Sequence, residues 1–335
     1  MPAESAPHER TVLCWPTRGR LYGELLPEAE RAHAEVASTI SRFEPVTMIA
    51  PPELAERAAE RCGPGVEVVG LETDDSWFRD TGPIYVTSAD GTERLALDWI
   101  FNSWGEKYRP WERDAALARA WAEHAGHDVR SVPMVLEGGS IAVDGDGTLV
   151  TTLQCLMHPN RNPQLTRAEI ESRLCDELGV DVVLWLPHGL VLDDDTDGHV
   201  DNVAAFARPG VLVVQGCADG VEADHLRASV DRRCAAGSID AGGRSIDVVE
   251  VPVLPFTDVG GRRVVVPYVN YYVGNGFVVV PVCGHDADAD MVALIADQYP
   301  GRETIALDVG AILAFGGGGI HCITQQVPAL TNLAG

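Results

Sequence analysis

One cysteine stands three residues after a run of four glycines in residues 315–326, which read Phe-Gly-Gly-Gly-Gly-Ile-His-Cys-Ile-Thr-Gln-Gln. Four consecutive glycines lose much chain entropy on ordering, and they let the backbone pass where any Cβ would clash. Most free cysteines are small buried hydrophobic residues, but this run would give Cys322 both access and nearby amide N–H groups. The Lys-Ser/Thr pair of a phosphate-binding loop is missing. The segment therefore predicts a reactive thiol, whereas His321 would point to the opposite face of an extended chain and is expected to be structural.

Acidic side chains and one histidine crowd residues 193–202, Asp-Asp-Asp-Thr-Asp-Gly-His-Val-Asp-Asn, directly before a hydrophobic run. If residues 198–202 are extended, His199 and Asp201 project from the same face. An imidazole beside a carboxylate suits proton transfer near neutral pH. Metal binding is the alternative, but the EF-hand pattern lacks its Glu at the twelfth position and no second histidine follows at i+4. The segment predicts an acid/base pair rather than a metal site.

Two further segments carry a carboxylate next to turn signals. In residues 74–83, Asp-Asp-Ser-Trp-Phe-Arg-Asp-Thr-Gly-Pro, the turn at Thr-Gly-Pro puts Asp80 at the end of an element, where site residues tend to lie. The flat apolar surface of Trp77 is close in sequence, although a core tryptophan and a salt bridge from Arg79 would explain the segment equally well. Residues 136–140, Leu-Glu-Gly-Gly-Ser, predict a β-bulge that aims Glu137 at a neighbour.

These residue types together meet the needs of one substrate class, the guanidinium ion. It is a planar cation whose N–H groups form a fork that matches carboxylates bidentately. Its central carbon is a poor electrophile, so attack needs a strong nucleophile such as a thiolate. An imidazole would protonate the departing nitrogen and then activate water. The inventory therefore favours cysteine-dependent hydrolysis of a guanidine.

The elements that must position these residues alternate along the chain. Helical spacing predicts helices at 27–43, 52–61, 112–124, 166–178, 222–233 and 288–299, the fourth with a capping box of Thr166 and Glu169. Between them, β-branched runs predict short strands at 11–15, 46–50, 66–71, 95–101, 148–152, 180–186, 203–207, 211–215, 246–251, 264–269, 277–282 and 304–307. No linker divides the chain, so one α/β domain over residues 1–335 is expected. The helix spacing hints at repeats of roughly sixty to seventy residues.

Charge and composition exclude several partners. The chain has 50 acidic against 25 basic residues, a net charge of −25, which repels phosphate backbones and anionic lipid and would attract a cationic substrate. Neither nucleic acid nor membrane is therefore expected as a partner. A polar amino terminus predicts no signal peptide. Eight cysteines at irregular spacings, with no CxxC pair, suit free thiols in a reducing, cytoplasmic compartment.

The motifs at Cys322, His199, Asp80 and Glu137 closely resemble the signatures of the agmatine deiminase family. So do Trp-Gly-Glu-Lys-Tyr at 104–108, Asn-Arg-Asn-Pro at 160–163 and Tyr-Val-Asn-Tyr-Tyr at 268–272, and the similarity runs through almost the whole chain in the expected order. The resemblance implies the pentein fold, a closed five-bladed α/β propeller with pseudo-fivefold repeats and the site in its central channel. It also implies that the protein needs no metal or organic cofactor.

The resemblance assigns a role to each candidate residue. Cys322 matches the nucleophile and His199 the general acid/base. Asp80 and Asp201 match the guanidinium-binding carboxylates. Glu137 matches an acidic residue that supports the site and orients His199. The implied reaction is hydrolysis of agmatine to N-carbamoylputrescine and ammonia through a thiouronium on the cysteine, as in polyamine and putrescine biosynthesis.

The substrate is less firmly indicated than the chemistry. Trp77 and Asp195 match positions near the alkyl chain and the distal amine of the substrate. A deiminase of arginine or peptidyl-arginine would need a cation for the substrate carboxylate, and this role is open to four residues: Arg18, Arg20, Lys107 and Arg109. An amidinotransferase, in which an amine replaces water, is another alternative. A non-enzymatic pentein binding protein is disfavoured, because it has no reason to keep the cysteine, histidine and carboxylates together. A homo-oligomer is compatible with the sequence.

Overall fold

Five three-stranded units of one design make up most of the chain. In each unit the first strand pairs antiparallel with the second, and the second pairs parallel with the third. A helix connects the two parallel strands, as a parallel pair requires. The structure, a computed structural model, describes residues 1–331. It confirms the predicted mixed α/β class.

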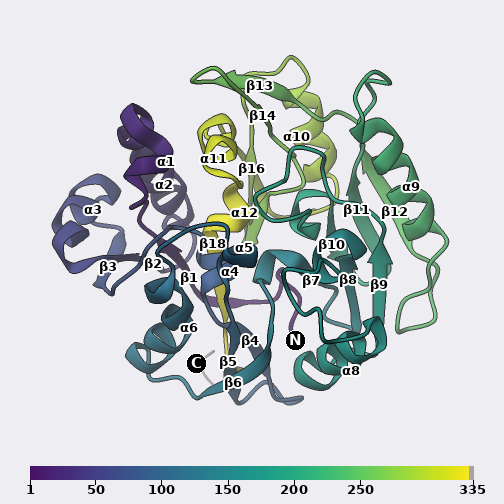
Figure 1. Ribbon diagram of the computed structural model, residues 1–335, viewed down its shortest axis with the longest axis horizontal. Helices are drawn as coiled ribbons and strands as arrows, with labels where there is room; N and C mark the ends of the chain where they lie inside the picture. The colour runs from purple at the N-terminus through teal and green to yellow at the C-terminus, as the bar shows by residue number, and fades with distance from the viewer. Residues whose placement is uncertain (332–335) are drawn as a thin grey trace.

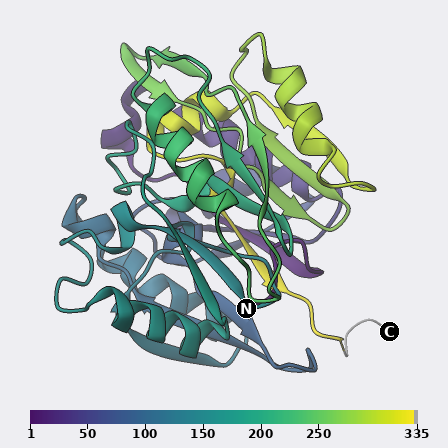
Figure 2. The same cartoon turned by 90° about the vertical axis from the view of Figure 1, so that its right-hand side faces the viewer.

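The strands form six sheets, and one of them joins the two ends of the chain. That sheet has the order β18 (Thr324–Pro328), β1 (His8–Cys14), β2 (Val46–Ala50) and β3 (Val66–Gly70). The yellow β18 and the purple β1 run side by side in Figure 2. The other units are β4 (Ile84–Thr87), β5 (Arg94–Ile100), β6 (Val129–Val135); β7 (Ile141–Val143), β8 (Thr148–Thr152), β9 (Val182–Leu186); β10 (Ala204–Arg208), β11 (Val211–Gln215), β12 (Asp247–Val251); and β15 (Tyr272–Gly274), β16 (Phe277–Pro281), β17 (Glu303–Leu307). A separate hairpin consists of β13 (Phe256–Val259) and β14 (Arg262–Val265).

The longer helices lie around the rim of the molecule, outside the strands (Figure 1). They are α2 (Leu26–Ile40), α3 (Ala55–Cys62), α6 (Glu112–His124), α8 (Arg167–Leu178), α9 (Asp224–Ala236) and α10 (Asp288–Ala296). The short ones are α1 (Gly19–Tyr22), η1 (Gly23–Leu25), η2 (Pro52–Leu54), α4 (Phe78–Thr81), α5 (Ser103–Glu106), η3 (Gly138–Ser140), α7 (Leu153–Leu156), η4 (Val200–Asn202), α11 (Gly310–Gly316) and α12 (Ile320–Ile323), where η marks a 3-10 helix. Within residues 1–331, no helix combines the length and the apolar character needed to cross a bilayer.

The middle strands of the units are the best buried. All residues of β2, β8, β11 and β16 are buried, so both faces of these strands are covered. Strands buried on both faces read as continuous apolar runs rather than alternating ones. This explains why the strands at residues 46–50, 148–152 and 211–215 are predicted with their observed bounds. The helix α6 also has its predicted bounds. The capping box of Thr166 and Glu169 is also confirmed at the start of α8.

The segments that lead from one unit to the next carry the candidate site residues. The helix α4 lies between β3 and β4, η3 between β6 and β7, η4 between β9 and β10, and α12 between β17 and β18. The helix α4 packs against both α12 and η3, and η3 packs against η4. Figure 1 shows α4 and α12 near the centre of the molecule. The repeated design of the units thus gathers four chain-distant turns at one place.

Candidate active site

Three predicted polar side chains converge on Gly139 in η3. A Cβ on this glycine would lie 2.6 Å from His199 Nδ1, 2.9 Å from Asp201 Oδ2 and 3.0 Å from Asp80 Oδ1. The backbone N–H of Gly139 donates to Asp80 Oδ1 at 2.9 Å. The glycine is therefore required by a close approach of side chains. The predicted β-bulge is wrong, because Glu137 precedes a 3-10 turn that joins two different sheets.

The Cys322 sulfur lies between a carboxylate and an amide. Its Sγ is 3.3 Å from Asp201 Oδ2, and Asn270 Nδ2 donates to it at 3.2 Å. Burial raises the pKa of the Cys322 thiol well above its usual value, and the charges of Asp201 and Asp80 raise it further. Until a cation enters, Cys322 is therefore a thiol whose hydrogen faces Asp201.

The glycine run lets bulky groups reach that sulfur. A Cβ on Gly318 would lie 2.6 Å from the Trp77 ring and 3.0 Å from Cys322 Sγ, and one on Gly319 would overlap the Asn270 side chain. The interpretation of the run as a place of close approach is thus confirmed. The backbone is nevertheless not extended at Cys322, because residues 320–323 form α12.

His199 is fully buried and faces two carboxylates. Its Nδ1 lies 3.8 Å from Asp80 Oδ2, and its Nε2 lies 4.0 Å from Glu137 Oε2. Burial lowers the pKa of His199, but Asp80, the neighbouring Cys155 and Glu137 outweigh it and raise the pKa well above the usual value. The surrounding charges therefore favour the protonated ring, and neither ring nitrogen has a hydrogen-bond partner among residues 1–331, so both are free to exchange a proton with a substrate.

The loop before His199 is curled rather than extended. The expectation of an extended segment at 198–202 is wrong, since residues 200–202 form the 3-10 helix η4. The buried Asp193 carboxylate imposes this shape, because its Oδ2 accepts from the backbone N–H of His199 at 3.1 Å and from Asn202 Nδ2 at 2.9 Å. His199 and Asp201 still converge, as the predicted acid/base pair requires.

The two carboxylates expected to bind the guanidinium, Asp80 and Asp201, differ in their surroundings. Burial raises the pKa of Asp201, but hydrogen bonding and charge from His321, together with His199, outweigh it and lower the pKa. Burial raises the pKa of Asp80. His199 opposes this shift, but Asp201 and Glu137 add to it, so the pKa of Asp80 is raised overall. One oxygen of Asp201, Oδ1, is buried and has no hydrogen-bond partner among the described residues. Crowded anions with an unpaired oxygen favour the arrival of a cation.

A narrow cavity reaches the Cys322 sulfur. Trp77, Asp80 and Cys322 line it, together with Asp75 and Asp195. His199 and Glu137 lie behind this wall at zero exposure. Asp201 lines a second, small cavity with Glu4 and His321. Four predicted residues, Trp77, Asp80, Asp195 and Cys322, thus line the cavity at the sulfur, whereas Asp201 reaches Cys322 from outside that lining.

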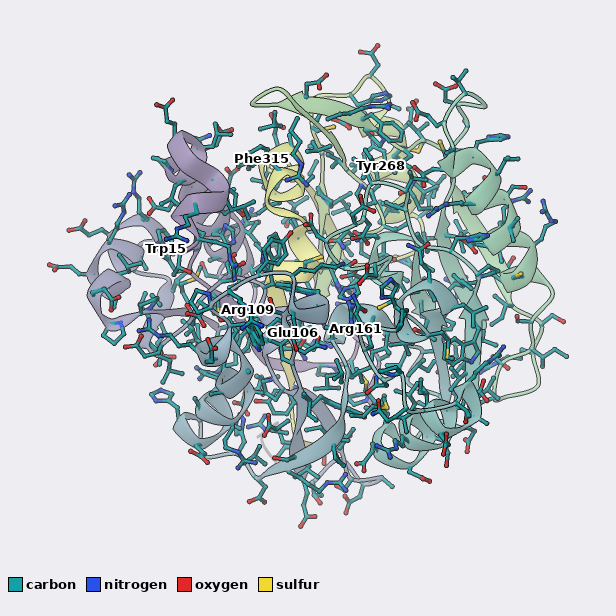
Figure 3. All side chains as sticks on the ribbon, viewed as in Figure 1. Trp15, Glu106, Arg109, Arg161, Tyr268 and Phe315 are labelled. Carbon is teal, nitrogen blue, oxygen red and sulfur yellow. The ribbon has the colours of Figure 1, made fainter. Side chains whose placement is uncertain are left out.

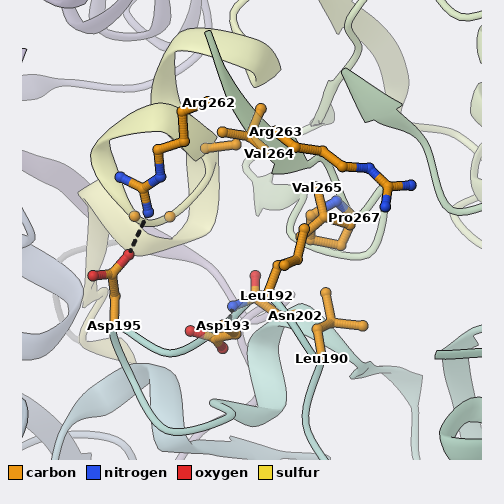
Figure 4. Close-up of a pocket in the computed structure, with 13 residues that line it drawn as sticks. Leu190, Leu192, Asp193, Asp195, Asn202, Arg262, Arg263, Val264, Val265 and Pro267 are labelled. Carbon is orange, nitrogen blue, oxygen red and sulfur yellow. Dashed lines mark hydrogen bonds and ion pairs between the residues drawn. The ribbon is translucent and has the colours of Figure 1, made fainter. Parts of the chain in front are cut away.

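Asp195 stands at the edge of this pocket, next to a further cavity (Figure 4). Its Oδ2 lies 3.4 Å from Arg262 Nη2, the contact dashed in Figure 4, and the Tyr108 hydroxyl donates to Oδ1. The Asp195 side chain is 23% exposed. The position fits a group that meets the outer end of a substrate.

Sequence reasoning assigns no role to three residues that hold the site. Trp104 Nε1 donates to Asp80 Oδ2 at 2.9 Å, and Arg161 Nε donates to Glu137 Oε1 at 2.6 Å. Arg161 lies near the centre of the molecule in Figure 3. The third is Asn270, beside the sulfur. All three lie in the motifs at 104–108, 160–163 and 268–272 that carry the family resemblance. Their place in these motifs was the signal in the sequence that could have identified them as site residues.

One cluster has the donor types of a metal site. Atoms of Glu137, Cys155 and His199, all buried, lie within 4.8 Å of one another. The guanidinium of Arg161 already neutralises Glu137 at 2.6 Å, and the charges around His199 favour its protonated form. Metal ligands must be deprotonated, and a neighbouring fixed cation opposes a second one. The cluster is therefore better suited to controlling the protonation of His199 than to binding a metal ion.

Known proteins are similar to this chain in sequence and fold over nearly their whole length. A Streptomyces coelicolor relative is 44% identical over 335 residues, covering 98% of each chain. The agmatine deiminase of Stutzerimonas stutzeri is 40% identical and covers 98% of this chain and 95% of its own. The solved agmatine deiminase of Enterococcus faecalis superposes with a TM-score of 0.93 at 31% identity, covering 98% and 95% of the two chains. A model of the Porphyromonas-type peptidyl-arginine deiminase family matches residues 1–328. The chain therefore belongs to that family.

Proposed function

We propose that this protein is an agmatine deiminase, which hydrolyses the guanidinium group of agmatine to N-carbamoylputrescine and ammonia. The observation that carries the proposal is the lining of the pocket at Cys322. Three aspartates line it: Asp80, Asp75, which pairs with Arg18, and Asp195, which pairs with Arg262. Among residues 1–331, no lysine or arginine lines the cavity itself. Agmatine carries a cation at each end, so an acidic pocket suits both ends. The relatives named as agmatine deiminases support the same substrate.

Arginine as the substrate would require a free cation for its carboxylate. The four candidate cations lie around an outer cavity instead. Three of them already face carboxylates: Arg18 and Asp75 are 2.6 Å apart, Lys107 and Asp197 2.7 Å, and Arg109 and Glu106 2.8 Å. The fourth, Arg20, is exposed. This pairing favours a substrate without a carboxylate.

The contacts support a covalent route. The guanidinium lies against Asp80 and Asp201, the Cys322 thiol releases its proton to solvent, and the resulting thiolate attacks the guanidinium carbon. His199 gives its proton to one terminal nitrogen, the C–N bond breaks, and ammonia leaves an S-alkylthiouronium. His199 then takes a proton from water, and the hydroxide attacks the same carbon. The C–S bond breaks as the carbonyl of the product forms, and the proton of the new hydroxyl returns to the sulfur. A base that changes role between two steps is the general pattern of covalent hydrolysis.

The substrate itself is expected to activate the thiol. With its pKa raised by burial and two carboxylates, Cys322 is protonated at neutral pH. A bound cation offsets these carboxylates and lowers the thiol pKa. Cationic chloroacetamidine should therefore alkylate Cys322 at pH 7.5 at least about tenfold faster than neutral iodoacetamide, after correction for their rates with a free thiol. Mass spectrometry of the labelled peptide measures this. Equal corrected rates would contradict the argument.

Two finer features belong to the proposal. We infer that the five units close into a five-bladed propeller, because they repeat one strand order and their connecting turns meet at the site. All eight cysteines are free thiols, which supports a reducing, cytoplasmic setting. There the product N-carbamoylputrescine would feed the formation of putrescine.

The deciding experiment is ammonia release by the purified protein from agmatine and from arginine in parallel. Under the proposal, kcat/KM for agmatine exceeds that for arginine by at least about 10³-fold, because the carboxylate of arginine would enter an acidic pocket without a partner. Comparable turnover of arginine would overturn the substrate assignment. Lack of ammonia from both, with Cys322 still alkylated by chloroacetamidine, would leave the chemistry standing and require a screen of other guanidines.

A further inference from the structure

A chain of charged contacts leads from the amino-terminal segment to the reactive sulfur. Glu4 Oε1 lies 2.6 Å from His321 Nε2. His321 Nδ1 lies 2.9 Å from Asp201 Oδ2, the same oxygen that faces Cys322 Sγ at 3.3 Å. Because both ring nitrogens of His321 face carboxylates, the ring carries two N–H groups and a positive charge. The sequence analysis expected His321 to point away from the site and to be structural. Its contact with Asp201 instead connects it to the reactive sulfur.

The charges along this chain stabilise one another. Burial and Arg79 lower the pKa of His321, but Glu4 and Asp201 outweigh them and raise it. Burial opposes the charge on Glu4, yet His321, Arg79 and His8 lower its pKa to about 2. Arg79 Nη1 also lies 3.2 Å from Glu4 Oε1. Glu4 thus holds the imidazolium in place against the repulsion of Arg79.

The two carboxylate oxygens of Asp201 have different surroundings. Oδ2 accepts from His321 and from the thiol, whereas the buried Oδ1 has no partner among residues 1–331. A carboxylate anchored through one oxygen cannot rotate freely, so the other oxygen keeps a fixed direction. Because Oδ2 lies 3.3 Å from the Cys322 sulfur, a guanidinium carbon attacked by that sulfur comes within reach of this carboxylate.

We propose that Glu4 and His321 are positioning residues, which reach Asp201 from the side opposite the substrate and fix its carboxylate for the guanidinium. Neither residue lines the cavity at Cys322, and both line the second cavity together with Asp201. Glu4 reaches this place because the chain start is tied to the end of α8, where the amino group of Met1 donates to the Leu178 carbonyl, beside the N label in Figure 1. This inference rests on the proposed guanidine chemistry and adds to it a role for the amino-terminal segment.

The test is Glu4→Gln in the full chain, which keeps the shape of the side chain and removes its charge. Loss of this partner lets His321 deprotonate at lower pH. At pH 8, kcat/KM for agmatine should fall about tenfold, equivalent to one pKa unit of lost charge stabilisation. At lower pH, where His321 regains its proton, the deficit should shrink. Glu9→Gln, the same change on a residue that pairs with Arg94 at 2.7 Å, should stay within about twofold of the parent at every pH.

Two readouts keep this test separate from the agmatine assignment. The NMR titration of the His321 ring, identified by its loss in His321→Asn, should move to lower pH in Glu4→Gln. The apparent affinity for chloroacetamidine during alkylation of Cys322 should weaken about tenfold. If agmatine is not turned over by the parent protein, these two measurements still decide the inference. An unchanged His321 titration, or an activity deficit of equal size at all pH values, would overturn it.

Discussion

Cys322→Ala is expected to abolish agmatine turnover, lowering kcat by roughly 10⁴-fold or more, because the reaction loses the atom that forms the covalent intermediate. Asp80 and Asp201 are untouched by this change. The variant should therefore still bind agmatine with an affinity within about tenfold of the KM of the parent, measured by calorimetry. In the parent protein, acid quenching during turnover followed by mass spectrometry should detect an adduct on the peptide that contains Cys322.

The matched control is Cys217→Ala. This thiol is also buried, but it lies in a hydrophobic cluster beside β11 and away from the pocket. Its removal should leave kcat/KM for agmatine within about twofold, with a small loss of stability from the vacated volume. Residual activity of Cys322→Ala above about 1% of the parent would rule out a covalent route through this sulfur.

Long, strongly patterned elements could be predicted because their own residues decide them. The helix α6 and the strands β2, β8 and β11 have their predicted bounds, since each buries an apolar face or run of its own. Among residues 1–331, the sequence analysis misses the strands β4, β6, β7, β13, β15 and β18. The last of these, β18, completes the first unit. Its Gln325 and Gln326 are polar but buried, and pairing with β1 across the whole chain decides their conformation. Local propensity cannot reveal such a pairing.

The site residues were recognisable by type, while their local backbone was not. Cys322 and the His199–Asp201 pair are both assigned to extended chain, yet both lie in or beside helical turns of three or four residues. Turns this short have no periodicity to detect. They are held by distant partners such as Asn270, whose amide accepts from the backbone N–H of His321 at 3.0 Å. The repeated unit would have been the better guide, because the turn after β14 supplies Asn270 just as the other turns supply their site residues.

The largest expected effect on stability comes from Arg161→Met. Arg161 Nε lies 2.6 Å from Glu137 Oε1, and both side chains have zero exposure. Its Nη1 also reaches Asp197 Oδ2 at 2.6 Å, and its Nη2 donates to the Thr196 carbonyl at 2.8 Å. Removing one partner of a buried pair leaves an uncompensated charge, so the free energy of unfolding should fall by about 3–5 kcal/mol. Chemical denaturation of the parent and the variant measures this difference.

Two companion variants separate the buried charge from the loss of a side chain. Arg130→Met breaks an exposed pair with Glu177, with Arg130 51% exposed, and should cost at most about 1 kcal/mol. Adding Glu137→Leu to Arg161→Met removes the stranded carboxylate, so the double variant should be more stable than Arg161→Met alone. Activity should not return with stability, because His199 then lacks one of the anions that hold its proton. A double variant less stable than Arg161→Met would show that packing, and not the unpaired Glu137, causes the loss.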